Sequence, residues 1–111
     1  MPAISRDFCI ILVTCQSKKE AERIASSLLK KRLAACANVI CGVDSNFWWN
    51  GKIDRAGEVL VILKTRSGYF KRVEREVRRL HSYAVPEIIA LPIVAGSKGY
   101  LKWIDAETKI R

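Results

Sequence analysis

The run from Phe8 to Cys15 (FCIILVTC) limits the possible folds most, because it is apolar at nearly every position. A strand with one face in water alternates apolar and polar residues, so a continuous apolar run indicates a strand that is covered on both faces. The run from Glu87 to Ile93 has the same character, and Pro92 suits the end of a strand or a sheet edge. The chain therefore needs a sheet that is covered on both faces, by its own helices or by another protein surface.

A helix is expected directly after the first run. Ser17 and Glu20 form a capping box, in which each residue satisfies a free donor of the first helical turn. Apolar residues then recur at helical spacing, which predicts a helix to about Leu33.

Two more helices are expected later in the chain. Ser67 is predicted to cap the second, which ends before Pro86 because the residue ahead of a proline avoids helical geometry. A short third helix is expected over residues 100–108, with Leu101 and Ile104 as its anchors.

Two further strands are expected at residues 36–53 and 58–65, and two turn signals compete between them. Asn50-Gly51 is a strong signal for a two-residue hairpin. Residues 54–57 (DRAG) offer a four-residue turn instead. We prefer this second turn, because it leaves two strands of useful length.

The order of elements is therefore βαββαβ with a terminal helix, in one domain spanning residues 1–111. This order predicts an α+β, ferredoxin-like fold with a four-stranded sheet and both main helices on one face. The other face would be apolar and wet in a monomer, and the consecutive Phe47, Trp48 and Trp49 send large aromatics to both sides of their strand. Self-association is the simplest way to cover that face.

The chain carries 20 Lys and Arg against 11 Asp and Glu, a net charge of +9, so nucleic acid, an anionic membrane and a small anion are all conceivable partners. The surplus lies on the two main helical segments, with net +4 on residues 17–33 and net +5 on residues 64–80. A solvated cationic helix layer is the plain interpretation. An RNA-recognition motif also has βαββαβ order, but it stacks bases on aromatics of its third strand, and residues 58–65 contain none. We therefore expect no specific nucleic-acid partner.

The location of the protein follows from the apolar segments and the cysteines. No apolar stretch approaches the roughly 20 residues that span a bilayer. Phe8 to Val13 loosely imitates the apolar part of a signal peptide, but it is short, Asp7 precedes it and no cleavage site follows. We expect a cytoplasmic protein with no membrane partner. Its cysteines are then expected to be reduced thiols: Cys9, Cys15, Cys36 and Cys41.

A family resemblance is carried by six segments, which follow one another in order along residues 8–104: Val13-Thr-Cys15, Leu33-Ala-Ala-Cys-Ala-Asn38, Phe47-Trp-Trp-Asn-Gly-Lys-Ile53, Ile62-Leu-Lys-Thr65, Leu80-His-Ser-Tyr-Ala-Val-Pro-Glu-Ile-Ile-Ala-Leu-Pro92 and Tyr100-Leu-Lys-Trp103. With these segments the chain resembles the CutA divalent-cation tolerance proteins, which are related in architecture to the PII-like signalling proteins. The resemblance implies a cytoplasmic homotrimer of ferredoxin-like protomers, divalent-metal or copper binding in some members, and no established reaction.

Two positions depart from the family pattern. The loop after the second helix usually reads His-Pro-Tyr in the family, whereas here it is His81-Ser82-Tyr83, and Gln16 stands where proline is frequent. Both changes concern the stiffness of loops. Cys9 and Cys41 lie outside the pattern, and we interpret both as packing thiols.

The resemblance suggests a metal site at Cys15 and His81. A thiolate and an imidazole suit Cu or Zn far better than Mg or Ca, and Cys15 ends the first strand, where open sheets place ligands. Two donors do not complete a tetrahedral shell, so a neighbouring subunit, water or a small ligand has to supply the rest. The alternative is a packed thiol and a surface histidine. We expect no organic cofactor.

The resemblance also suggests a ligand-binding cleft between subunits, at Trp49, Lys64, Tyr83 and Glu87. Lys64 is suited to an anionic group. The alternative is that the aromatics only pack at an interface and that Lys64 pairs with Glu87 or another acid. A PII-like sensor, whose clefts bind a metabolite and whose loops dock an unidentified protein, is the runner-up function.

Catalysis finds little support in the sequence. The chain has one histidine and no Gly-rich phosphate loop, nucleophile elbow or HExxH motif, so only Cys15 near His81 would serve as thiolate and base. We expect a trimeric protein of divalent metal cation (copper) tolerance that is not an enzyme.

Overall fold

The computed structural model describes residues 7–110, so residues 1–6 and 111 of the predicted domain lie outside the described part. Within residues 7–110 the chain forms four strands, three α-helices and one short 3₁₀ helix: β1 (Phe8–Cys15), α1 (Lys18–Lys30), β2 (Cys36–Trp49), β3 (Lys52–Arg66), the 3₁₀ helix (Ser67–Tyr69), α2 (Phe70–Leu80), β4 (Ile88–Pro92) and α3 (Lys98–Glu107). This order confirms the predicted βαββαβ arrangement with a terminal helix. None of the helices in the described range is long and apolar enough to cross a membrane.

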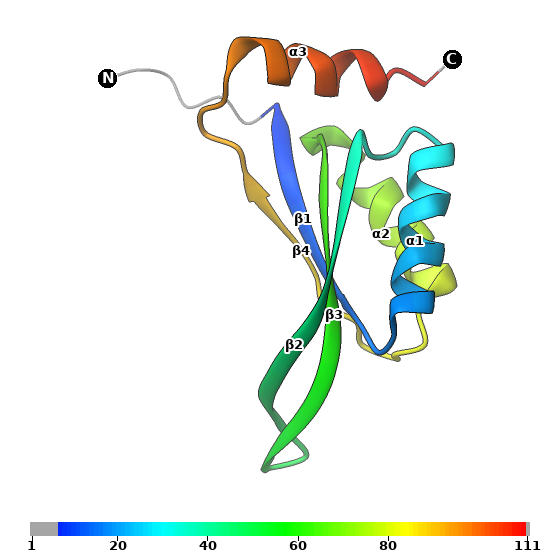
Figure 1. Cartoon of the computed structure of the whole chain (residues 1–111), viewed down its shortest axis with the longest axis vertical. Helices are drawn as coiled ribbons and strands as arrows, with labels where there is room; N and C mark the ends of the chain where they lie inside the picture. Colours follow the sequence, from blue (N-terminus) through cyan, green and yellow to red (C-terminus); the bar gives the residue numbers. More distant parts are fainter. Residues whose placement is uncertain (1–6, 111) are drawn as a thin grey trace.

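The strands form one antiparallel sheet in the order β2-β3-β1-β4. This strand order is that of the ferredoxin-like fold, as predicted. Figure 1 shows α1 and α2 on one side of the sheet, α3 across one end of it, and the β2–β3 hairpin extending beyond the helices.

The core lies between the sheet and α1 and α2, and β1 is its centre. Every second residue of β1, beginning with Cys9 and ending with Cys15, is at most 3% exposed. Because side chains alternate along a strand, these residues face the helices and the residues between them face the other way. Their neighbours in the core come from β3 and the two helices: Val61, Leu63, Ile24, Leu28, Val73 and Val77.

The second face of the sheet carries no helix within the described part of the chain, and it is apolar. Antiparallel pairing places Leu12 between Ile62 on β3 and Ile89 on β4. Ile89 and Leu91 are 49% and 47% exposed. We call this surface the open face, and its aliphatic residues are Ile10, Leu12, Ile40, Leu60, Ile62, Ile89 and Leu91.

The preferred turn at residues 54–57 was wrong. Asn50 and Gly51 have φ values of +50° and +76°, and Trp49 pairs with Lys52 across the turn. A two-residue turn with positive φ at both positions matches the twist of the flanking strands, which is why it prevails over the longer turn. Residues 54–57 instead continue β3, and a bulge in β2 with Gly42 at φ +80° accommodates the change in register.

The predicted start of α1 is confirmed and its predicted end was wrong. Ser17 Oγ accepts a hydrogen bond from the Glu20 amide at 3.1 Å. The helix stops at Lys30 because Arg32 takes a φ of +58°, and the Leu33 amide then donates to a carbonyl of the last turn at 2.9 Å. This is the Schellman arrangement that closes many helices.

Ser67 does not cap α2, contrary to the prediction. It opens the 3₁₀ helix, and its amide donates to the Asp7 carbonyl at 2.8 Å. Helix α2 begins at Phe70 without a side-chain cap. The expected fourth strand and third helix are both present, and α3 begins two residues earlier than expected.

A buried carboxylate joins α1 to α2. The Glu76 side chain is 8% exposed and lies 2.8 Å from Lys31 Nζ, and both Arg79 Nε and an Arg79 terminal nitrogen donate to it at 2.8 Å. Ser27 Oγ on α1 also donates to it. The hydrogen bonds from Arg79, Lys31 and Ser27 hold the pKa of Glu76 far below its ordinary value of 4.5.

Glu76→Gln is therefore expected to weaken the fold at neutral pH and much less in acid. A depressed folded-state pKa stabilises the fold above the ordinary carboxyl pKa, and this contribution is lost as the pH falls below it. We expect the free energy of unfolding to fall by roughly 1–3 kcal/mol at pH 7, because hydrogen bonds to a charged acceptor are replaced by weaker ones. Urea unfolding at a series of pH values between 7 and about 3 measures the difference.

Glu74→Gln is the matched control on the same helix. Glu74 is 28% exposed and lies 3.8 Å from Arg78, so its removal should cost less than about 0.5 kcal/mol. Equal losses for the two variants, or a loss for Glu76→Gln that does not shrink in acid, would contradict a special role for Glu76.

Candidate metal centre and adjoining groove

The last residue of β1 places a thiol beneath the helix layer. Cys15 is fully buried and pairs with Val59 of β3, so the alternation of the strand turns its side chain toward α1 and α2. Burial, and then the negative charges of Glu20 and Glu58, raise the pKa of Cys15 to about 12. The side chain is therefore a neutral thiol at physiological pH.

His81 follows the last residue of α2 and has both ring nitrogens in hydrogen bonds. The Tyr83 amide donates to Nδ1 at 3.0 Å, so Nδ1 is the acceptor nitrogen. Nε2 then carries the proton and donates to the Thr14 carbonyl at 2.7 Å. These two contacts fix the neutral tautomer of the ring and hold the loop after α2 against the end of β1.

Glu20 is the third member of the cluster, and it was not among the predicted site residues. Its carboxylate accepts from the Ser82 amide at 2.6 Å and from the Gln16 amide at 3.3 Å. Desolvation raises its pKa, but the hydrogen bonds from Ser82 and Gln16 outweigh that effect, so the pKa of Glu20 lies below its ordinary value. The sequence singled Glu20 out only as a capping residue, although its place in the first turn of the helix that directly follows Cys15 is the signal that could have found it.

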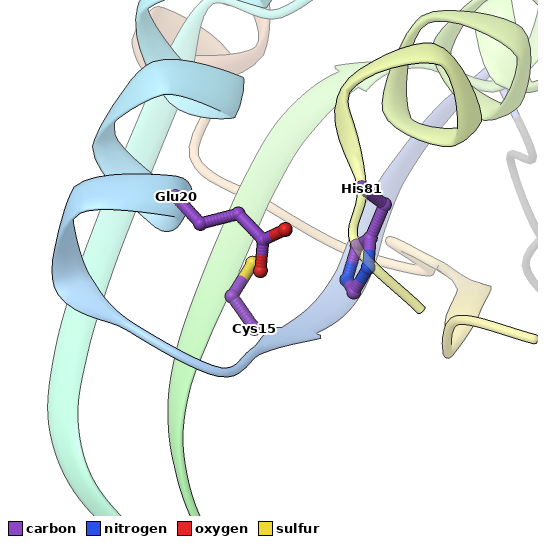
Figure 2. Close-up of side chains that lie close together, drawn as sticks. All are labelled: Cys15, Glu20 and His81. Atoms are coloured by element: carbon purple, nitrogen blue, oxygen red, sulfur yellow. The ribbon is translucent and has the colours of Figure 1, made fainter. Parts of the chain in front are cut away.

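The side chains of Cys15, Glu20 and His81 converge from three elements of the fold (Figure 2). The ligand atoms, one from each residue, all lie within 4.8 Å of one another. Around a tetrahedral zinc, ligand atoms at about 2.0–2.3 Å lie roughly 3.3–3.8 Å apart. The donors therefore need only a small contraction to surround an ion, and the structure brings together the two residues predicted for a metal site.

A groove of about 680 Å³ opens on the other side of the same strand end. Trp49, Tyr83 and Glu87, three of the four predicted cleft residues, line it together with Thr14 and Glu58. The Tyr83 hydroxyl donates to Glu58 at 3.0 Å. Desolvation, and then this hydrogen bond, raise the pKa of Tyr83 to about 12.

The fourth predicted cleft residue, Lys64, lies elsewhere on β3. It pairs across the sheet with Cys36 and Ile10, and its Nζ donates to Asn38 Oδ1. The groove is instead lined by residues 54–56 and Glu58 in the first half of β3, whereas Lys64 lies near the end of that strand. Within one protomer Lys64 therefore does not join Trp49, Tyr83 and Glu87, and it does not pair with Glu87.

The chain is similar to known proteins in both sequence and structure. A family model described as "CutA1 divalent ion tolerance protein" matches residues 9–107. A "Divalent-cation tolerance protein CutA" of Archaeoglobus fulgidus is 52% identical over 95 residues, which cover 86% of this chain and 92% of the relative. "Protein CutA 1, chloroplastic" of Oryza sativa is 39% identical over 100 residues, covering 90% of this chain and 56% of the relative, so the chain spans about half of that relative's length.

A solved structure has the same fold. It is described as the "Periplasmic divalent cation tolerance protein CutA" from Archaeoglobus fulgidus and superimposes with a TM-score of 0.89 at 48% identity. The superposition covers 92% of this chain and 99% of that one.

The contacts of Glu20 predict a measurable effect on the loop after α2. Glu20→Ala removes the acceptor of the Ser82 amide, so that amide should exchange with solvent about tenfold faster or more, since a hydrogen bond to a charged acceptor contributes roughly 1.5–3 kcal/mol. Native-state hydrogen exchange followed by NMR measures it. Glu22→Ala is the matched control, because Glu22 lies on the same helix, is 60% exposed and pairs with Lys18. Unchanged exchange at Ser82 in Glu20→Ala would contradict the contact.

Proposed function

The chain belongs to the CutA1 divalent ion tolerance family, and from that premise we propose that it serves divalent-cation tolerance by binding the ion at Cys15, Glu20 and His81. The convergence of a thiol, a carboxylate and an imidazole within 4.8 Å is the observation that carries the proposal. Thiolate and imidazole ligands favour Cu and Zn over Mg and Ca, so copper or zinc is the proposed ion. No organic cofactor is part of the proposal.

Loading the site requires two local changes. The Cys15 thiol has to lose its proton, because a coordinating thiol is deprotonated. His81 has to give up at least one hydrogen bond for the ion, since Nδ1 accepts from the Tyr83 amide and Nε2 donates to the Thr14 carbonyl. Glu20 needs no protonation change, because its pKa is already low. A water or a side chain from a neighbouring subunit would complete a tetrahedral shell.

We propose that the site binds and does not catalyse. A nucleophilic cysteine needs a depressed pKa, whereas burial raises the pKa of Cys15 to about 12. Both ring nitrogens of His81 are already engaged, so the ring is not available as a general base.

We propose the cytoplasm, a reducing compartment, as the location of the protein. The support is that all four cysteines are free thiols.

We propose a homotrimer in which the open face is covered by other protomers. The support is the seven aliphatic side chains of that face, several of them nearly half exposed in one protomer. Burying apolar area contributes roughly 25 cal/mol per Å², so a shared sheet interface of ordinary size outweighs the cost of association. The number three is what the family resemblance implies.

The second candidate function is that of a PII-like module with a ligand or a partner protein in the groove. One observation favours it: Thr14 and Tyr83, which line the groove, are also the two residues that hydrogen-bond the His81 ring. A groove occupant and a metal ion would therefore act on the same loop. Trp49 and Glu87 would supply an aromatic surface and a carboxylate to such an occupant.

Metal binding is expected to release about one proton per ion at neutral pH. The proton comes from Cys15, because Glu20 is already ionised and His81 already neutral, so affinity should rise about tenfold per pH unit. Titration calorimetry of Zn²⁺ in buffers of different ionisation enthalpy counts the protons. Cys15→Ser, Glu20→Gln and His81→Ala should each weaken binding at least tenfold.

Cys41→Ser is the matched control for these variants. Cys41 is an exposed cysteine in the bulge of β2, separated from Cys15 by β3 and outside the cluster of Cys15, Glu20 and His81, so its loss should leave the zinc affinity unchanged. The proposed site fails if Cys15→Ser binds zinc as tightly as the wild type, or if Cys41→Ser loses as much affinity as Cys15→Ser.

The assembly is tested by placing a charge on the open face. Ile89→Lys, on the edge strand β4, should convert a particle of about 38 kDa, three times 12.6 kDa, into smaller species, because an ammonium group would be buried without a partner. Light scattering measures the mass, and circular dichroism reports the fold. Ser26→Lys, on the exposed side of α1, is the control and should leave the mass unchanged. A monomeric wild type at micromolar concentration would overturn the trimer.

A further inference from the structure

We propose that the outer surface of α1 and α2 binds the phosphate backbone of a nucleic-acid duplex without reading its sequence. Helix α1 holds four basic and two acidic side chains and α2 holds five and two, so the two helices carry a net charge of +5, more than half of the +9 of the whole chain. The two helices lie side by side on one face of the sheet, which gathers this charge on one surface (Figure 1).

The acidic residues on this surface are already compensated, so the remaining charge is positive. Glu22 pairs with Lys18, Glu74 with Arg78, and Glu76 with Lys31 and Arg79. The carboxylate of Glu20 is occupied by two backbone amides. Six basic residues of α1 and α2 have no ion pair with a carboxylate of residues 7–110, and we call them the helix-layer patch: Lys19, Arg23, Lys30, Lys71, Arg72 and Arg75.

The helix-layer patch is accessible to a large partner. All six side chains belong to exposed residues. The helices cover the face of the sheet opposite to the open face, so an assembly that covers the open face leaves the patch on the outside. Each protomer then presents its own cationic surface.

The composition of this surface selects the kind of partner. Leu29 is the one large hydrophobic residue exposed on α1 and α2, both of which lie wholly in the described range. Protein interfaces need buried aromatic or aliphatic anchors, and membrane insertion needs an apolar stripe, so both fit poorly. Binding of single strands uses exposed aromatics on which bases stack, and none is exposed on these helices. Lysine and arginine spread along two adjacent helices match the repeated phosphates of a duplex.

The test is the salt dependence of duplex binding, measured by fluorescence anisotropy with two 20-bp DNA duplexes of unrelated sequence and one RNA duplex. Each phosphate contact contributes about 0.9 to the slope of log K against log salt. With six contacts, affinity should fall roughly a thousandfold between 50 and 200 mM NaCl. The two DNA sequences should differ by less than about threefold, since only phosphates are contacted.

A triple variant, Lys71→Gln with Arg72→Gln and Arg75→Gln, removes half of the patch. Its salt response over the same range should fall to about 40-fold, because three contacts remain. The control removes the same charge elsewhere, by Lys52→Gln, Lys98→Gln and Lys102→Gln, all exposed residues outside α1 and α2, and should keep the wild-type response.

Three results would overturn the proposal: no duplex binding at 50 mM NaCl, equal losses in the two triple variants, or strong preference for one DNA sequence. Tighter binding to vesicles with anionic headgroups than to either duplex, with the same dependence on the patch, would assign the surface to a membrane instead. Circular dichroism of both triple variants establishes that they are folded. None of these measurements depends on the metal site.

Discussion

The pairing of β1 with β3 on one side and β4 on the other is the constraint on which the rest of the structure depends. The pairing fixes which side chains of β1 face the helices, and a slip of one residue would turn the whole core to the open face. With this register Cys15 is the last residue on the helix side and Thr14 the last on the other side. The thiol therefore enters the helix layer where α1 begins and α2 ends, and the groove begins one residue away.

The Glu20 carboxylate contacts two residues at which the chain departs from the pattern implied by the family resemblance. The resemblance leads us to expect proline at the positions of Gln16 and Ser82, and a proline has no amide hydrogen to donate. In this chain both amides donate to the Glu20 carboxylate. The departures thus add two hydrogen bonds between the start of α1 and the loop after α2, and they stabilise an ionised carboxylate beside Cys15. The stiffness that a proline would give the loop is supplied here by contacts to a side chain.

The sequence predicted the elements well where one interaction dominates, and less well where two compete. Apolar runs, helical spacing and the Ser17 cap identified β1, α1 and α2, because each pattern reflects burial in one core. The hairpin was misplaced because strand length was weighed above the positive φ that Asn50 and Gly51 adopt readily. Ser67 looked like a cap, but the 3₁₀ helix moves the start of α2 beyond its reach.

The sequence also predicted some residues of the candidate site correctly and missed or misplaced others. Cys15 and His81 came from the family resemblance, whereas Glu20 was hidden because its capping position already explained it. Lys64 was grouped with Trp49 by analogy, but the long hairpin separates them along β3. The position of the turn fixes which residues of β2 and β3 lie opposite each other. A prediction that misplaces the turn therefore misplaces every residue pair across these two strands.

The His81 ring connects the two faces of the sheet. Its Nε2 contacts the carbonyl of Thr14, and its Nδ1 contacts the amide of Tyr83, and both residues line the groove. Because neither nitrogen has a free lone pair, an ion that binds through Nδ1 has to displace the Tyr83 amide. An ion that binds through Nε2 requires the ring proton to move to Nδ1, so both contacts are lost. The first change frees the loop that carries the Tyr83 phenol toward Glu58, and the second also frees the Thr14 carbonyl beside the groove. Either change alters the groove wall, because Thr14 and Tyr83 both contact the His81 ring and line the groove. Binding of an ion at Cys15, Glu20 and His81 would therefore change the shape of the groove through these two residues, without a long path through the core.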